Sequence, residues 1–187
     1  MLTHIIPIFF MRNGNCLSHR SLARPRHGAD CLTAFLSTYR NRVDRKGRVS
    51  VPAAYRGALS DSGFQGIIAY PSMIEPVIEA FGRDLLEQMS RRRTDQSIEG
   101  GNFEQLLLGG EDGLVETIMA LARELPFDGE GRVILPAELV AHAEISDRAT
   151  FVGRGNRFQI WQPEAFEHYQ AEAIGRLRMR LRREGST

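Results

Sequence analysis

A dense group of basic side chains lies between residues 40 and 48, interrupted by a single acid, Asp44. The five bases are Arg40, Arg42, Arg45, Lys46 and Arg48. Lysine and arginine neutralise DNA phosphates, and an arginine can also donate two hydrogen bonds to the edge of a guanine. The wider stretch 33–60 carries six bases against that one acid. Because a basic patch is the expected footprint of a DNA-binding protein, these five residues are the candidate DNA contacts.

The residue types needed for catalysis or metal binding do not come together in the sequence. His142 and His168 are isolated, and Cys16 and Cys31 lie outside any metal-ligand spacing. No glycine-rich phosphate loop follows a strand pattern. We therefore expect no enzyme, no catalytic residue, no metal and no cofactor. The two cysteines make no disulfide framework, which fits a reducing cytoplasm, and no apolar run is long enough to cross a membrane.

The basic group overlaps the first of two copies of a ten-residue motif. Residues 44–53 read DRKGRVSVPA and residues 128–137 read DGEGRVILPA, with six of ten positions identical at an offset of 84 residues. An internal repeat of this kind indicates that one structural unit occurs twice. Each copy predicts a strand, a tight turn, a second strand and a short helix that begins near the proline. Further strands follow in both copies, and then helices over about 83–93 and 163–183.

The turn in each copy contains residues that fix its shape. Asp44 and Asp128 can accept hydrogen bonds from backbone N–H groups two residues further on, and Gly47 and Gly131 stand where a tight turn needs a positive φ. A bidentate ion pair between the aspartate and the arginine four residues later would pin the turn. We therefore assign structural roles to Asp44, Gly47, Asp128, Gly131 and Arg132.

The two copies differ in charge. Residues 126–147 contain one base, Arg132, against five acids, whereas the first copy is basic. Because DNA affinity is dominated by neutralisation of phosphates, we expect the first copy to face DNA. Two alternatives stay open. Arg40 and Arg42 can be the solvated face of an edge strand, and Arg48 can serve the ion pair with Asp44 as readily as a DNA contact.

Together these motifs resemble one known family. The doubled Asp-x-x-Gly-Arg-(apolar)-x-(apolar)-Pro and the later Gly-x-x-x-x-Phe-x-Ile-Trp at 153–161 resemble the MraZ family, a tandem version of the AbrB-like swapped-hairpin DNA-binding fold. The resemblance covers about residues 33–172. It implies a β-rich α/β fold in which two pseudo-symmetric AbrB-like swapped-hairpin half-barrels share one chain, with short peripheral helices. Phe158 and Trp161 lie in an apolar strand, and we expect them in the core rather than as a stacking platform.

Five segments are expected along the chain. Residues 1–32 lack periodicity and are interpreted as a disordered leader outside the fold. The first AbrB-like repeat covers 33–95, a helical linker 96–121, the second AbrB-like repeat 122–170, and a basic C-terminal helix or tail 171–187. For this tail, a frayed and solvated terminus is favoured over a basic amphipathic helix, because disorder concentrates at chain ends.

The resemblance also implies a function. The protein would be a sequence-specific transcriptional regulator that acts as a homo-oligomeric ring on tandem short repeats in the promoter of the division and cell-wall gene cluster. Its partners would be double-stranded DNA and further copies of itself, with no membrane, and its location would be the cytoplasm, in association with the nucleoid. One alternative is an antitoxin-like AbrB-fold protein that binds a protein partner and its own promoter. Another is a structural ring that binds DNA only incidentally.

Overall fold

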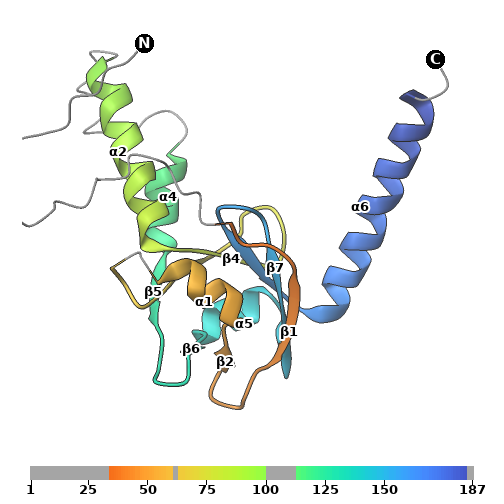
Figure 1. Ribbon diagram of the computed structural model, residues 1–187, viewed down its shortest axis with the longest axis horizontal. Coiled ribbons are helices and arrows are strands. Elements are labelled where there is room, and N and C mark those ends of the chain that lie inside the picture. The colour runs from red at the N-terminus through yellow and green to blue at the C-terminus, as the bar shows by residue number, and fades with distance from the viewer. Residues whose placement is uncertain (1–33, 61–62, 100–112, 185–187) are drawn as a thin grey trace, which may run out of the picture. The chain divides into compact units, whose positions relative to one another are not determined.

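The computed structural model describes residues 34–60, 63–99 and 113–184, and the expected leader lies outside the described residues. Its strands and helices follow one another twice in the same order (Figure 1). The first set is β1 (Thr38–Arg42), β2 (Arg48–Ser50), α1 (Ala53–Leu59), β3 (Gly66–Pro71), β4 (Ile78–Phe81) and α2 (Arg83–Glu99). The second set, which α4 (Leu114–Leu121) precedes, is β5 (Arg123–Pro126), β6 (Arg132–Ile134), α5 (Ala137–His142), β7 (Arg148–Gly153), β8 (Phe158–Trp161) and α6 (Pro163–Glu184).

Strands of the two sets exchange partners across the sheet. Six strands form one antiparallel sheet in the order β1-β7-β8-β4-β3-β5, while β2 and β6 form a separate two-stranded ribbon. β1 of the first set pairs with β7 of the second, and β5 of the second set pairs with β3 of the first. Interchanging the two sets only reverses the strand order, so a pseudo-twofold axis passes between β4 and β8. The expected fold, two pseudo-symmetric swapped-hairpin halves in one chain, is confirmed.

The β2–β6 ribbon lies on the same pseudo-axis. The central valines of its two strands pair with each other and are buried. Directly after each strand, a backbone N–H donates to the glycine of the other set's turn. The Val51 N–H donates to Gly131 O at 3.1 Å, and the Leu135 N–H donates to Gly47 O at 2.9 Å. Each half therefore completes the backbone hydrogen bonding of the other half's hairpin.

The main core lies between the sheet on one side and the ribbon with α1 and α5 on the other. Phe35, Tyr55 and Phe158 meet there with ring centroids 5.0–5.3 Å apart. The Tyr55 hydroxyl donates to Ser37 O at 2.7 Å, which satisfies its polar end at the edge of the core. Phe158 is 0% exposed and Trp161 is 2% exposed, so both are buried as expected.

The opposite face of the sheet carries the longer helices. α2 and α4 pack over β3 and β4, and α6 begins against β7 and β8. α2 continues past the expected end at Arg93 to Glu99. The expected boundaries at 95/96 and 170/171 fall inside α2 and α6 respectively.

The C-terminal segment is helical rather than frayed, because α6 runs without a break to Glu184. The helix expected over about 163–183 is therefore confirmed, and the frayed terminus favoured for this segment is wrong as far as Glu184. Leucine, methionine and arginine, which fill this segment, are good helix formers. The helix is also anchored at its start by Phe166, which is buried against Trp161, and an Arg176–Glu172 ion pair of 3.3 Å spans one turn.

A buried polar pair lies where the pseudo-axis crosses the sheet. Glu79 of β4 faces Gln159 of β8, and the Gln159 Nε2 donates to Glu79 Oε1 at 2.6 Å. Arg157 Nε donates to Glu79 Oε2 at 3.2 Å, and Trp161 Nε1 donates to Gln159 Oε1 at 3.0 Å. The two halves thus place different residues, a carboxylate and an amide, at equivalent positions.

The ribbon contact predicts which glycine cannot be replaced. Gly47 has φ +75°, and a Cβ there would lie 2.8 Å from Leu135 O, a backbone atom that the ribbon holds in place. Gly47→Ala should lower the free energy of unfolding by about 1–3 kcal/mol or more, from backbone strain plus this collision. Chemical denaturation measures the effect. Gly129→Ala is the control because a Cβ there meets nothing within 4 Å, and it should change stability by no more than about 0.5 kcal/mol. Equal losses would contradict the ribbon argument.

Candidate nucleic-acid interface

Two turns of the same construction flank the β2–β6 ribbon (Figure 1). We call residues 44–47 the first turn and residues 128–131 the second turn. In the first, Asp44 Oδ1 accepts the backbone N–H groups of Lys46 and Arg48 at 2.8 and 2.9 Å. In the second, Asp128 Oδ1 accepts the corresponding N–H groups at 2.9 Å each. The expected roles of the two aspartates in shaping their turns agree with these contacts.

The second oxygen of each aspartate holds an arginine. Arg48 Nε donates to Asp44 Oδ2 at 2.6 Å, and Arg132 Nε donates to Asp128 Oδ2 at 2.8 Å. The sequence predicted bidentate ion pairs. In the structure, the Nε of each arginine donates to one carboxylate oxygen, and the other carboxylate oxygen accepts backbone N–H groups instead. The turn glycines have φ +75° and +73°, which L-residues with a side chain rarely adopt.

These hydrogen bonds favour the ionised carboxylates. The backbone N–H of Arg48 has the largest effect on the pKa of Asp44. Burial opposes it, but hydrogen bonds from the Arg48 side chain and the Lys46 N–H add to it, so the pKa is lowered to about 2. The backbone N–H and then the side chain of Arg132 lower the pKa of Asp128 to about 2. Both carboxylates are therefore ionised at any physiological pH, and each is paired with the arginine of its own turn.

The bases of the first turn are arranged differently from the single arginine of the second. Arg45 and Lys46 are exposed at the tip, and no acidic partner for either is found among the described residues. Arg132, in contrast, binds two acids, Asp128 at 2.8 Å and Glu130 at 2.7 Å. The first turn thus presents unneutralised positive charge, and the second turn does not.

Strand pairing brings in one arginine that sequence reasoning missed. Arg42, exposed at the end of β1, pairs directly across the sheet with Arg148 of β7, so both side chains lie on the same face. The ion pair of Arg148 with the neighbouring Asp147 is long, at 3.9 Å. Like charges directly opposite each other are unfavourable unless an anion lies between them. Arg148 follows the acidic second copy in the sequence. It lies beside Arg42 because β7 pairs with β1, which no local sequence signal predicts.

Two of the expected DNA contacts already have partners within the chain. Arg40 lies on β1 but forms an ion pair with Glu167 of α6, away from the first turn. Arg48 is half-buried and bound to Asp44. The structure therefore places Arg42 beside Arg148, directly before the exposed Arg45 and Lys46, and it leaves Arg40 and Arg48 outside this group. We call these four residues the basic surface.

The described residues contain no group of histidine, cysteine, aspartate or glutamate side chains that could hold a metal ion. Across the described ranges, no helix is both long and apolar enough to cross a membrane.

Comparison with known proteins gives one consistent result. A family model described as "MraZ protein, putative antitoxin-like" matches residues 118–180. The chain is 46% identical over 143 residues to the transcriptional regulator MraZ of Rickettsia bellii, covering 76% of this chain and 90% of that protein. It is 42% identical over 139 residues to the transcriptional regulator MraZ of Pelagibacter ubique, covering 74% of this chain and 84% of that protein.

The low pKa of the turn aspartates predicts an acid-dependent loss of stability. With a folded-state pKa of about 2 and an ordinary value of 3.8, Asp44 contributes stability above pH 4 that is lost as the pH falls from about 4 to about 2. Asp44→Asn keeps one acceptor but cannot ionise. It should therefore be less stable than the wild type at pH 7, and the difference should shrink over that range. Urea unfolding of both proteins at several pH values measures this, and a difference that stays the same from pH 7 to pH 2 would contradict the role of the Asp44 carboxylate.

Proposed function

Because the chain belongs to the MraZ family of transcriptional regulators, we propose that it binds double-stranded DNA through the basic surface beside its first turn. We further propose that it acts as a homo-oligomeric ring on tandem short repeats in the promoter of the division and cell-wall gene cluster. The observation that carries the DNA site is the pair of exposed bases, Arg45 and Lys46, at the tip of a turn whose own acid is bound to Arg48.

The chemistry of the basic surface suits phosphate. Arg45 and Lys46 project from a turn whose backbone is fixed by hydrogen bonds, so little backbone conformational freedom is lost when they bind. Arg42 and Arg148 repel each other across two strands, and a phosphate between them would turn that repulsion into two favourable contacts. Release of counterions from neutralised phosphates then drives binding, which makes the affinity strongly salt-dependent.

We expect the second turn to have a structural role and to make no contact with DNA. Asp128 and Glu130 both hold Arg132, and Arg56 of α1 packs over Gly131, where an added Cβ would lie 2.0 Å from its Nη1. An acidic turn held against a duplex would be repelled by the phosphates. The DNA would therefore lie toward the first turn of each chain, and a ring would present one such turn per subunit.

A second candidate function follows from the description of the family model. The description reads "putative antitoxin-like". Under this alternative, the chain would bind a protein partner as well as its own promoter. The two functions separate experimentally, because a protein partner would compete with self-assembly or DNA, whereas a promoter regulator alone would bind its upstream region when purified. Footprinting on the DNA upstream of its own coding sequence tests the regulator function directly.

Charge removal should affect the two turns differently. Lys46→Ala should weaken DNA binding and reduce the slope of log affinity against log salt by about one unit for each phosphate that is no longer neutralised. Glu130→Ala is the matched control at the same position of the second turn, and it should leave affinity unchanged or raise it slightly by removing a repulsion. Fluorescence anisotropy over a range of salt concentrations measures both. If the two variants reduce affinity equally, the first turn is not the DNA site.

Binding should also depend on the spacing of the DNA repeats. One basic turn contacts few base pairs, so tight binding requires several turns held in one assembly, where later contacts benefit from a high effective concentration. This benefit needs successive sites on one face of the duplex, about 10 bp or a multiple apart. Moving adjacent repeats apart by about half a turn should abolish tight binding in gel-shift assays, although every repeat stays intact. An affinity that stays flat across a series of single-base-pair spacers would exclude the ring mechanism.

A further inference from the structure

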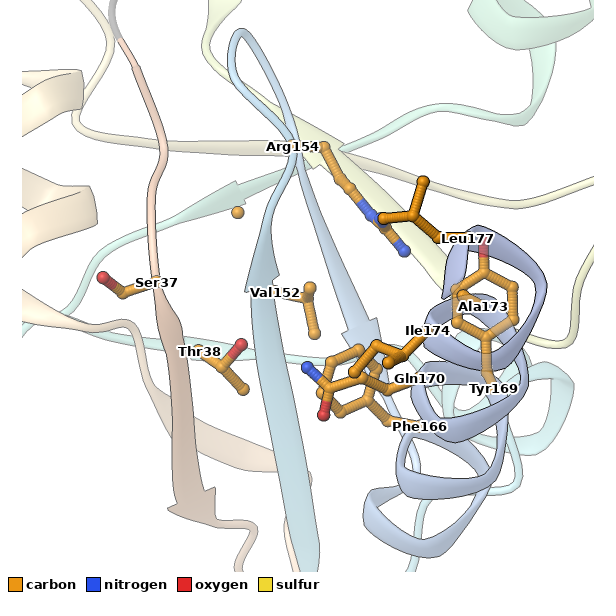
Figure 2. Close-up of a pocket in the computed structure, with 11 residues that line it drawn as sticks. Ser37, Thr38, Val152, Arg154, Phe166, Tyr169, Gln170, Ala173, Ile174 and Leu177 are labelled. Carbon is orange, nitrogen blue, oxygen red and sulfur yellow. The ribbon is translucent and has the colours of Figure 1, made fainter. Parts of the chain in front are cut away.

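A groove runs between α6 and the β1–β7 edge of the sheet. Figure 2 shows α6 side chains facing Thr38 of β1 and Val152 of β7 across it. The cavity has a volume of about 340 Å³ and a largely apolar wall. The α6 residues that line it share one face of the helix, at spacings of three and four: Phe166, Tyr169, Gln170, Ala173, Ile174 and Leu177.

The apolar face of α6 continues beyond the groove into solvent. Ile174 is 43% exposed, Leu177 is 53% exposed, and Leu181, one turn further on the same face, is 58% exposed. A surface helix normally turns such a stripe toward a core. Among the described residues, no other helix covers it. The stripe is therefore suited to contact with a further apolar surface.

The equivalent groove in the first half is filled by a helix. α4 places Ile118, which is 5% exposed, against Ile68 of β3 and Phe81 of β4, next to α2. By strand register, Tyr70 of β3 occupies the place that Val152 has in the second half. The pseudo-symmetry therefore indicates that a groove of this construction accepts an apolar helix.

The residues directly before β1 do not supply that helix. Phe35 exchanges two backbone hydrogen bonds with Gly155, N–H to O at 2.6 Å and O to N–H at 3.1 Å, so residues 34–37 approach β1 in an extended form. In the other half, α4 ends at Leu121, immediately before β5. The two halves thus differ in how the chain enters, and the groove beside α6 needs another occupant.

The charge of α6 identifies an occupant. Its first half, 163–173, carries three glutamates and no lysine or arginine, whereas its second half, 174–184, carries five arginines and one glutamate. Two such helices placed antiparallel bring each acidic half beside the basic half of the other. Placed parallel, they bring like charges together.

We propose that a second copy of this chain inserts its α6 into the groove, antiparallel to the first, to form a twofold contact. With the axis at Ile174, the exposed Leu177 and Leu181 of each chain cover the Phe166–Tyr169 end of the other groove. A twofold contact buries the same patch on both chains and is self-complementary. The proposed α6 contact rests on the self-association in the proposed function and does not depend on DNA binding. A different surface must link the neighbours within a ring, because a twofold contact inverts one chain relative to the other and tandem repeats need neighbours that face the same way.

The first experiment measures molar mass by light scattering after gel filtration, without DNA. Leu177→Asp should reduce the mass of the wild-type assembly by at least half. Met179→Asp is the control, because Met179 is 64% exposed on the face of α6 away from the groove, and it should keep the wild-type mass. A wild-type assembly whose mass Leu177→Asp leaves unchanged overturns the α6 contact alone. A monomeric wild type overturns both this contact and the proposed ring.

Disulfide trapping keeps the test decisive if Leu177→Asp does not fold. In a Cys16→Ser, Cys31→Ser chain, Ile174→Cys should form a covalent dimer on oxidation, because the two copies meet at the axis. Arg182→Cys should stay monomeric, because antiparallel helices separate its copies by about 24 Å, beyond the reach of a disulfide. Absence of the first link, or equal yields of both, overturns the proposal.

Discussion

The pairing of β2 with β6 is the contact on which both halves of the fold depend. Three residues from each half form the ribbon, and the N–H that follows each strand donates to the turn glycine of the other half. A half of this size buries too little apolar surface to be stable alone. β1 and β5 each pair with a strand of the opposite half, β7 and β3 respectively, and form the two edges of the six-stranded sheet. The core and the two turns therefore depend on contacts that both halves supply.

The same scaffold supports two different surfaces. Asp44 and Asp128 accept the same set of hydrogen bonds, so the backbone of the two turns is equivalent. What differs is the side chains that the scaffold does not need. Arg45 and Lys46 occupy positions where the second turn has Gly129 and Glu130. The arginine that shapes each turn and the residues at the turn's tip are thus separate. The first turn therefore exposes two bases at its tip, whereas the acids of the second turn bind Arg132.

Much of this organisation follows from local sequence, and the remainder from long-range pairing. The repeat fixes strand, turn and helix because aspartate, glycine and proline each impose a specific backbone geometry at the turn. Local sequence does not determine which strand pairs with β1. The position of Arg148 opposite Arg42 and the ion pair of Arg40 with Glu167 therefore could not be predicted. The pattern predicted a helix to about residue 183, as observed, but the preference for a frayed end was wrong because the start of the helix is anchored on Trp161.

The pairing of Glu79 with Gln159 at the centre of the sheet has a consequence for folding during protein synthesis. First halves leave the ribosome before second halves, and on one messenger many of them emerge close together. Two first halves that met would bring two Glu79 carboxylates into buried contact, without the Gln159 amide or the Arg157 guanidinium that the native pair provides. Like charges in a buried site are strongly disfavoured. A carboxylate at this position would thus disfavour pairing between two first halves and favour pairing with the second half of the same chain.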